Sequence, residues 1–289
     1  MMFLKKMKKI ILLLSVLFLT ASCSEYQKVL KGEDVGKKYA TAEQLYEEAE
    51  AGEGNSRRKY KKALRLFEQI VPEYRGRPQA QKLMFIYANT YYQLGDYFLS
   101  GYQFERFAES YPDSERVEEG AYKGAKSYYF LSPRYSLDQT ETQQALDKMQ
   151  AFINRYPQSE HLDEANEIVT ELRVKLERKA YEVAKQYHHT EDYRAAITSF
   201  NNFLLDHPGS PFREQAYFYR FDSAYIYAVN SYEFVMGERL ETARSYFNDY
   251  ARYFPEGEFI TQAEEALAEI EDWEQRLENL TEVSHNTEE

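Results

Sequence analysis

The side chains that most often perform catalysis or bind metals are scattered through this sequence. The five His do not cluster, and the one adjacent pair, His188 and His189, points to different faces of any helix. Asp and Glu are abundant, but no spacing marks two of them as an acid and base pair. Neither a glycine-rich phosphate loop nor a nucleophile elbow is present. We therefore expect no enzyme activity, no cofactor and no metal site.

The single cysteine, Cys23, has a more specific context. Four Lys precede an apolar run over residues 10–19, and Thr20-Ala21-Ser22-Cys23 follows. A basic start with a ten-residue apolar core is typical of an export signal and is too short to cross a membrane. The segment from Leu19 to Cys23 resembles a bacterial lipobox, in which the Cys becomes a lipid-bearing N-terminus. We expect residues 1–22 to be a signal peptide and Cys23 to carry the lipid. The alternative is a plain secretory signal that leaves Cys23 as an unmodified thiol.

One pattern recurs along the chain and organises its helices. A large residue lies near the end of a helix-like segment, with Pro eight positions later and a small residue four positions earlier. The large residues and their Pro are Phe104 with Pro112, Met149 with Pro157, Phe200 with Pro208, and Phe247 with Pro255; Phe67 with Arg75 is a degenerate copy. The small residues are Ala63, Ser100, Ala145, Ala196 and Ala243. A small residue lets two helices approach, and Pro ends a helix.

The second copy contains a longer pattern, which indicates the fold. It comprises Ala88, Tyr91, Gly95-Asp96-Tyr97, Ser100, Phe104, Phe107 and Pro112. This order resembles the tetratricopeptide repeat, which is about 34 residues long. We predict an all-α solenoid of about five helix pairs with a C-terminal capping helix. Arrays of this kind present extended surfaces that bind other polypeptides.

Two neighbouring repeats supply candidate residues for binding a peptide. In tetratricopeptide repeats, regularly spaced positions of the first helix face the concave side. This register predicts a groove formed by Lys82, Phe85, Asn89, Tyr92, Tyr122, Lys126 and Tyr129. Tyr beside Asn and Lys suits an extended peptide, because together they supply apolar area and hydrogen bonds. Most other aromatic residues fall at repeat anchors, and we expect them to pack between helices.

Composition changes along the chain suggest its organisation. We expect a signal peptide over 1–22, a lipidated tether over 23–40, repeats 1–3 over 41–157, a second half over 158–280 and a disordered tail over 281–289. The second half comprises a long helix at about 159–188, repeats 4 and 5, and the capping helix, with an insertion near 230–238. Removing the four Lys of the signal peptide changes the formal charge from −12 to −16. This acidity disfavours nucleic acid as a partner.

Two blocks resemble one particular family. The first is Ser132-Pro133-Arg134-Tyr135-Ser136-Leu137-Asp138-Gln139-Thr140, which runs into Ala145 and then Phe152-Ile153-Asn154-Arg155-Tyr156-Pro157. The second comprises Leu172-Arg173, Leu176, Tyr181-Glu182-Val183-Ala184, Tyr187, Tyr193, Ala195 and Ala196. Both are similar to the BamD family, lipoproteins of the β-barrel assembly machinery of the outer membrane. The resemblance covers about residues 20–256.

This resemblance implies a location and two kinds of partner. The protein would be lipid-anchored on the periplasmic face of the outer membrane. Its C-terminal half would dock on the periplasmic domains of the barrel-forming subunit. Its N-terminal repeats would receive unfolded outer-membrane β-barrel proteins, the clients, through their C-terminal aromatic signal.

Two other functions are alternatives to this hypothesis. One is a different periplasmic tetratricopeptide scaffold that coordinates cell-wall synthesis with envelope constriction. Such scaffolds usually carry a coiled coil, and no sustained heptad precedes the repeats here. The other is a glycan-binding lipoprotein with helical repeats, a class of longer proteins that place aromatic platforms on large loops.

Overall fold

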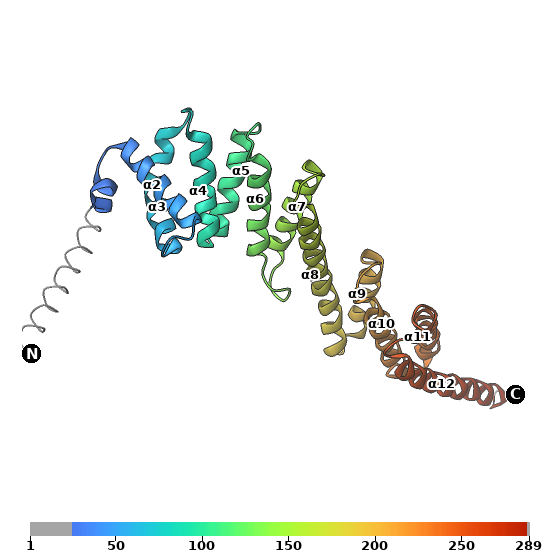
Figure 1. The fold of residues 1–289 in the computed structure, drawn as a ribbon. Coiled ribbons are helices and arrows are strands. Elements are labelled where there is room, and N and C mark those ends of the chain that lie inside the picture. Colours follow the sequence, from blue (N-terminus) through green and yellow to red (C-terminus); the bar gives the residue numbers. More distant parts are fainter. Residues whose placement is uncertain (1–24, 288–289) are drawn as a thin grey trace, which may run out of the picture. The chain divides into compact units, whose positions relative to one another are not determined.

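The computed structural model describes residues 25–287, with side chains to residue 280, and the regular structure in this range is helical. Cys23 and the predicted signal peptide lie outside these residues. The elements are α2 (Val35–Glu50), α3 (Ser56–Ile70), the 3₁₀ helix η1 (Val71–Tyr74), α4 (Ala80–Leu94), α5 (Tyr97–Ser110), α6 (Val117–Leu131), α7 (Thr140–Arg155), α8 (Leu162–His189), α9 (Tyr193–Asp206), α10 (Arg213–Val229), α11 (Glu233–Tyr253) and α12 (Ile260–Thr287). They form five successive pairs and a final helix, which confirms the predicted all-α repeat fold (Figure 1).

The helices divide into two compact units. Unit 1 contains the described residues up to Ser132 together with Gln144–Ile168, and unit 2 contains Pro133–Gln143 and the described residues from Val169 onward. The predicted border between residues 157 and 158 is therefore not where the units divide. The first turns of α8 pack on α6 of unit 1, whereas the rest of the same helix packs on α9 and α10.

The repeat anchors are buried, as the sequence predicts. Phe67, Phe104, Met149 and Phe200 are fully buried, and the small residues four positions before them are equally inaccessible. Each small residue brings the paired helices close enough for the large side chain to fill the space between them. In unit 1, the rings of Phe104 and Phe107 each form a T-shaped pair with the ring of Phe85.

Three helices end in the same way before a Pro. Tyr111, His207 and Phe254 cap α5, α9 and α11 with φ between −135° and −126° and ψ near 61–62°. Each of these residues precedes Pro, whose ring excludes the helical conformation at the preceding position. The recurring Pro therefore determines where the second helix of a repeat stops.

The predicted tether over 23–40 requires correction. Residues 25–31 are helical, and α2 already begins at Val35. Tyr26, Val29 and Leu30 pack on the core of unit 1, and the Tyr26 hydroxyl donates a hydrogen bond to the Lys62 carbonyl at 3.0 Å. These three residues have the spacing of one helix face, and burying them stabilises a segment that composition alone marks as a linker.

The C-terminal region also differs in detail from expectation. Helix α12 continues to Thr287, past the predicted end at residue 280, and no Gly or Pro interrupts it. Its apolar face packs on the core of unit 2 through Ala263, Ile270 and Trp273. Of the predicted insertion near 230–238, only Asn230–Tyr232 form a turn, because α11 begins at Glu233. No helix among the described residues has the length and apolar character needed to cross a membrane.

Candidate peptide-binding surface

A row of hydrogen-bonded polar side chains joins the first helices of successive pairs in unit 1. Asn89 of α4 is buried; it donates to the Tyr46 hydroxyl of α2 at 2.7 Å and accepts from Lys123 Nζ of α6 at 2.9 Å. Lys123 also pairs with Glu119 one turn earlier, at 2.8 Å. Asn89 also donates to Glu50 Oε1 at 3.3 Å, so both its amide nitrogen and its amide oxygen have partners, and the row links three helices.

The charges at one end of this row lie over an aromatic ring. Arg116 pairs with Glu119 at 2.9 Å, and its guanidinium lies 3.5 Å from the centroid of the Phe85 ring. Burial raises the pKa of Glu119, but Lys123 and Arg116 outweigh it and lower the pKa overall. Glu119 is therefore ionised at neutral pH, and Arg116 covers Phe85. A cleft of about 460 Å³ lies beside this cover, between Lys82 and the loop at Ser114.

A second polar cluster joins α6 to the start of α8. Tyr122 stacks on His161 with ring centroids 4.0 Å apart, and its hydroxyl donates to Glu164. Lys126 forms an ion pair with the same carboxylate and lies 3.2 Å from the Tyr122 hydroxyl. The hydrogen bonds from Lys126 and Tyr122 lower the pKa of Glu164. Lys126 is thus already paired within the protein.

Aromatic side chains form a more exposed edge at the C-terminal ends of α4 and α6. Phe130 stacks on Tyr97 at 4.4 Å between centroids and contacts Tyr92 and Tyr129 at 6.2 and 5.4 Å. Phe130 is 42% exposed, and both Tyr92 and Tyr129 are partly exposed. Burial raises the pKa of Tyr92 to about 12, so its hydroxyl is a neutral hydrogen-bonding group at physiological pH. This aromatic edge offers flat apolar area together with phenolic hydroxyls.

The structure separates the seven predicted groove residues into two classes. Phe85, Asn89 and Tyr122 are buried and hold helices together, so the interpretation that they face a peptide is wrong for this conformation. Lys82, Tyr92, Lys126 and Tyr129 retain exposed area. Lys82 pairs with Glu43 at 2.6 Å, and this hydrogen bond raises its pKa. Neighbouring helices approach closely enough to bury the three residues in the middle of the predicted groove.

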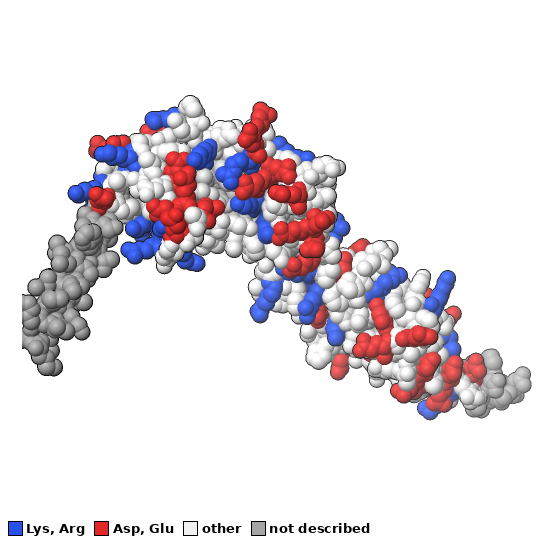
Figure 2. Space-filling model, in the orientation of Figure 1, with Lys and Arg blue, Asp and Glu red and all other residues white. Residues whose placement is uncertain are grey.

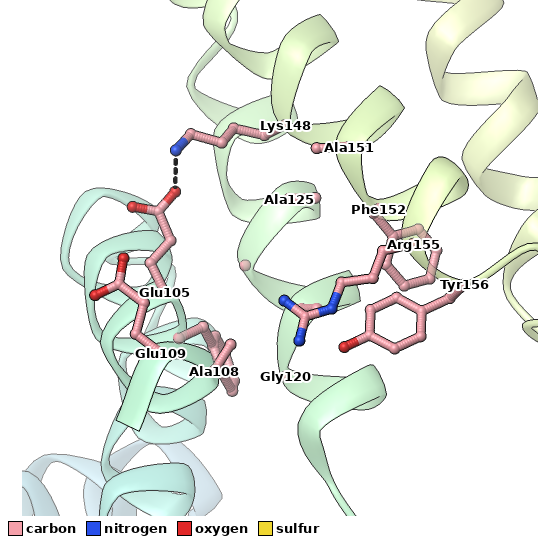
Figure 3. A pocket seen from close by; sticks show the side chains of 13 residues that line it. Glu105, Ala108, Glu109, Gly120, Ala125, Lys148, Ala151, Phe152, Arg155 and Tyr156 are labelled. Carbon is pink, nitrogen blue, oxygen red and sulfur yellow. Dashed lines mark ion pairs between the residues drawn. The ribbon is translucent and has the colours of Figure 1, made fainter. Parts of the chain in front are cut away.

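A cleft that the repeat pattern does not predict lies between α5 and α7, across α6. It has a volume of about 260 Å³ and is lined by Phe104, Glu105, Ala108, Glu109, Gly120, Ala121, Gly124, Ala125, Lys148, Ala151, Phe152, Arg155 and Tyr156 (Figure 3). The available signal was the repeated pair of small residues, Gly120-Ala121 and Gly124-Ala125, one turn apart in α6. Such a stripe leaves space unless a neighbour fills it.

Charge is distributed unevenly over the surface. Figure 2 shows patches of acidic side chains on the visible face of each unit, with basic side chains between them. The formal charge is −12 for the whole chain. Within the described residues, no group of three or more His, Cys, Asp or Glu is arranged to hold a metal ion.

Comparison with known proteins gives a consistent set of matches. The model of a protein family described as "YfiO: Outer membrane lipoprotein" matches residues 38–226. The outer membrane protein assembly factor BamD of Xylella fastidiosa is 25% identical over 160 residues, which cover 52% of this chain and 55% of that protein. A putative outer membrane protein assembly factor BamD of Aquifex aeolicus is 26% identical over 224 residues, which cover 77% and 65%. Both matches span less than two thirds of the relative.

A solved structure of a designed protein also matches. It is the de novo designed helical repeat protein DHR64, which is 14% identical and aligned over 89% of this chain and 99% of its own. The TM-score is 0.17, so this likeness carries no further conclusion.

Proposed function

We propose that this chain, which belongs to the YfiO family of outer membrane lipoproteins, is a binding subunit of the machinery that folds and inserts β-barrel proteins into the outer membrane. Two relatives whose names describe outer membrane protein assembly factors support this function. In this role the chain binds polypeptides and performs no chemical step.

The proposed anchor is a covalent lipid on Cys23, on the periplasmic face of the membrane. Cys23 lies outside the described residues, so the support for this anchor comes from the sequence alone. That support is the export signal and the lipobox. A Cys23→Ser variant should lose acyl labelling and become soluble in the periplasm. Full membrane association of that variant would show that partner docking, rather than lipid, supplies the anchor.

The proposed client surface comprises Lys82, Tyr92, Lys126, Tyr129 and Phe130 of unit 1. The observation that carries this assignment is the exposed aromatic edge beside a polar row whose hydrogen bonds are already made. Unfolded β-barrel proteins present alternating apolar side chains and unpaired backbone groups. Rings with phenolic hydroxyls match both features without requiring a particular sequence.

Most of the client affinity should come from the aromatic side chains. An exposed ion pair contributes only about 0–1 kcal/mol, and Lys126 must first exchange its own partner, Glu164, for a client carboxylate. Salt should therefore weaken client binding only modestly.

Photocrosslinking tests the client surface directly. Benzoylphenylalanine replaces Tyr92 or Tyr129 in the full chain, and the probe is a labelled 15-residue peptide copied from the C-terminus of an outer-membrane β-barrel protein. We expect crosslinks from both positions. The matched control is the same substitution at Tyr232, an exposed Tyr of unit 2. Crosslinks from Tyr232 alone would move the client site to unit 2.

The proposed docking surface for the barrel-forming subunit is the start of α11. Tyr232 and Phe234 are 80% and 85% exposed, and their rings stack at 5.9 Å between centroids. Two adjacent exposed rings favour an interaction surface over a structural role. A Tyr232→Ser, Phe234→Ser variant should lose copurification of the large β-barrel protein from solubilised envelopes, whereas Tyr253→Ser should retain it. Copurification of cell-wall synthases instead would favour the scaffold function.

A further inference from the structure

The cleft between α5 and α7 contains two polar groups that lack a hydrogen-bond or ion-pair partner among the described residues, although the Arg155 guanidinium lies over the Tyr156 ring at 5.5 Å from its centroid. Among the described residues, the Arg155 guanidinium forms no ion pair, and the buried hydroxyl of Tyr156 has no hydrogen-bond partner. Figure 3 shows the two side chains together on the α7 side of the cleft, with the guanidinium and the hydroxyl directed into it. A buried hydroxyl without a protein partner costs free energy, so a ligand group that accepts its hydrogen bond would be stabilised here.

The floor of the cleft is apolar and shallow because α6 contributes only Gly and Ala residues to it. A Cβ atom at Gly120 would lie 2.9 Å from the Phe107 ring, and one at Gly124 would lie 3.1 Å from Phe104 Cβ. These two glycines therefore allow α5 and α6 to touch. Ala121 and Ala125 are left as the floor, and their short side chains do not fill the space between α5 and α7.

The other charges of the cleft limit what can enter it. Glu105 of α5 pairs with Lys148 of α7 at 2.6 Å and so spans the cleft at one end (Figure 3). Glu109 also lies on the α5 wall, so the free positive charge of the cleft belongs to Arg155 on the α7 wall. An anion is therefore favoured beside Arg155 and disfavoured beside Glu109. The acidic group of an occupant should lie against the α7 wall rather than the α5 wall.

We propose that this cleft binds a polypeptide segment in which an apolar side chain enters the space over Ala121 and an adjacent acidic side chain is held by Arg155 and Tyr156. The volume of about 260 Å³ is below the range of about 300–1,000 Å³ typical of small-molecule pockets, and it suits one or two side chains. Arg binds carboxylates through two parallel hydrogen bonds, and the Tyr hydroxyl supplies a third donor. None of the residues that line this cleft belongs to the client surface, so the proposal does not depend on client binding there.

Selection from a library tests the chemistry of the occupant. Phage-displayed random 12-residue peptides are selected on the full chain in detergent, and selected peptides are measured by fluorescence anisotropy. We expect enriched sequences in which Asp or Glu follows or precedes an apolar residue. Arg155→Ala should weaken their binding about tenfold, as expected for a charged hydrogen bond. Tyr156→Phe should weaken it several-fold, and Arg155→Lys should restore part of the loss.

Two further variants separate this cleft from the rest of the surface. Ala121→Leu fills the floor and should abolish binding, with its circular dichroism spectrum confirming the fold. The matched control is Arg252→Ala, because Arg252 lies over the adjacent Tyr253 ring much as Arg155 lies over Tyr156. Binding that survives both Arg155→Ala and Ala121→Leu overturns the proposal. Selection of neutral or basic peptides, or failure to select any peptide, overturns it as well.

Discussion

Units 1 and 2 have the same repeat anchors but place their polar groups differently. In unit 1, a neutral amide, Asn89, occupies the buried middle of the row, and the charged groups lie at its edges. In unit 2, ionisable groups are themselves inside: Arg220 is buried between α9 and α11, and His188 meets Asp222 between α8 and α10. The buried middle of the unit 1 row is therefore a group that does not titrate, whereas unit 2 buries groups that do.

The shared anchors should have the largest effects and should be equal in the two units. Truncating Phe104 in unit 1 or Phe200 in unit 2 to Ala should cost about 3–5 kcal/mol of unfolding free energy, since both side chains are fully buried. Thermal and urea unfolding followed by circular dichroism measure this loss. An unchanged melting temperature in both variants would contradict the repeat register.

The pH dependence should distinguish the units. Burial raises the pKa of Asp222 from its ordinary 3.8 to about 6. The folded state then binds the Asp222 proton more tightly than the unfolded state does. Asp222 therefore contributes stability that is fully present below its unfolded pKa. This contribution is lost as the pH rises through 6. We expect wild-type stability to fall by about 2–3 kcal/mol relative to Asp222→Asn between pH 4 and pH 7.

A second group that titrates, His188, lies next to Asp222. His188 Nε2 lies 3.3 Å from the carboxylate, Ser223 contacts the other ring nitrogen, and the rings of Tyr193 and Tyr219 pack on the imidazole. Burial lowers the pKa of His188, with His189 and Lys185 adding to the effect. His188 therefore favours folding at high pH and loses that contribution as pH falls. A constant difference between wild type and Asp222→Asn across this range would mean that the pair is ionised throughout.

The polar row of unit 1 should respond to truncation but not to pH. Asn89→Ala removes the hydrogen bonds to the Tyr46 hydroxyl and to Lys123 Nζ, although Lys123 keeps its ion pair with Glu119, and this loss should cost about 2 kcal/mol. Urea unfolding at pH 5 and pH 8 should give the same loss. A loss that changes with pH would show that Lys123 and Glu119, rather than the amide, control this part of the unit.

The turns before α5 and α9 have equivalent backbone conformations, and we expect the smallest changes in stability from substitutions there. Gly95 between α4 and α5 and Glu191 between α8 and α9 both have positive φ, at 81° and 62°, and each precedes an Asp that caps the next helix. Only Gly adopts this conformation without strain. Glu191→Gly should therefore stabilise the protein by about 1 kcal/mol, and Gly95→Ala should destabilise it by a similar amount. Melting temperatures that move in the same direction would refute the equivalence of the turns.

Much of this fold follows from local sequence alone. The spacing of large, small and Pro residues predicts which side chains are buried and where α5, α9 and α11 end, because packing and Pro geometry act within one repeat. The family resemblance likewise rests on two short blocks, which lie at the junction of repeats 3 and 4.

Tertiary structure decided which polar residues are available for binding. The sequence placed Phe85, Asn89 and Tyr122 on one face, but the separation of neighbouring helices buries all three. Packing likewise decided the role of Tyr26, which is partly buried against the core of unit 1 in a segment that composition marks as a tether. The cleft at Arg155 depends on three helices at once: two glycines in α6 admit α5, and α7 supplies the charge. Periodicity assigns a residue to a face of its own helix, whereas exposure depends on how closely the next helix approaches.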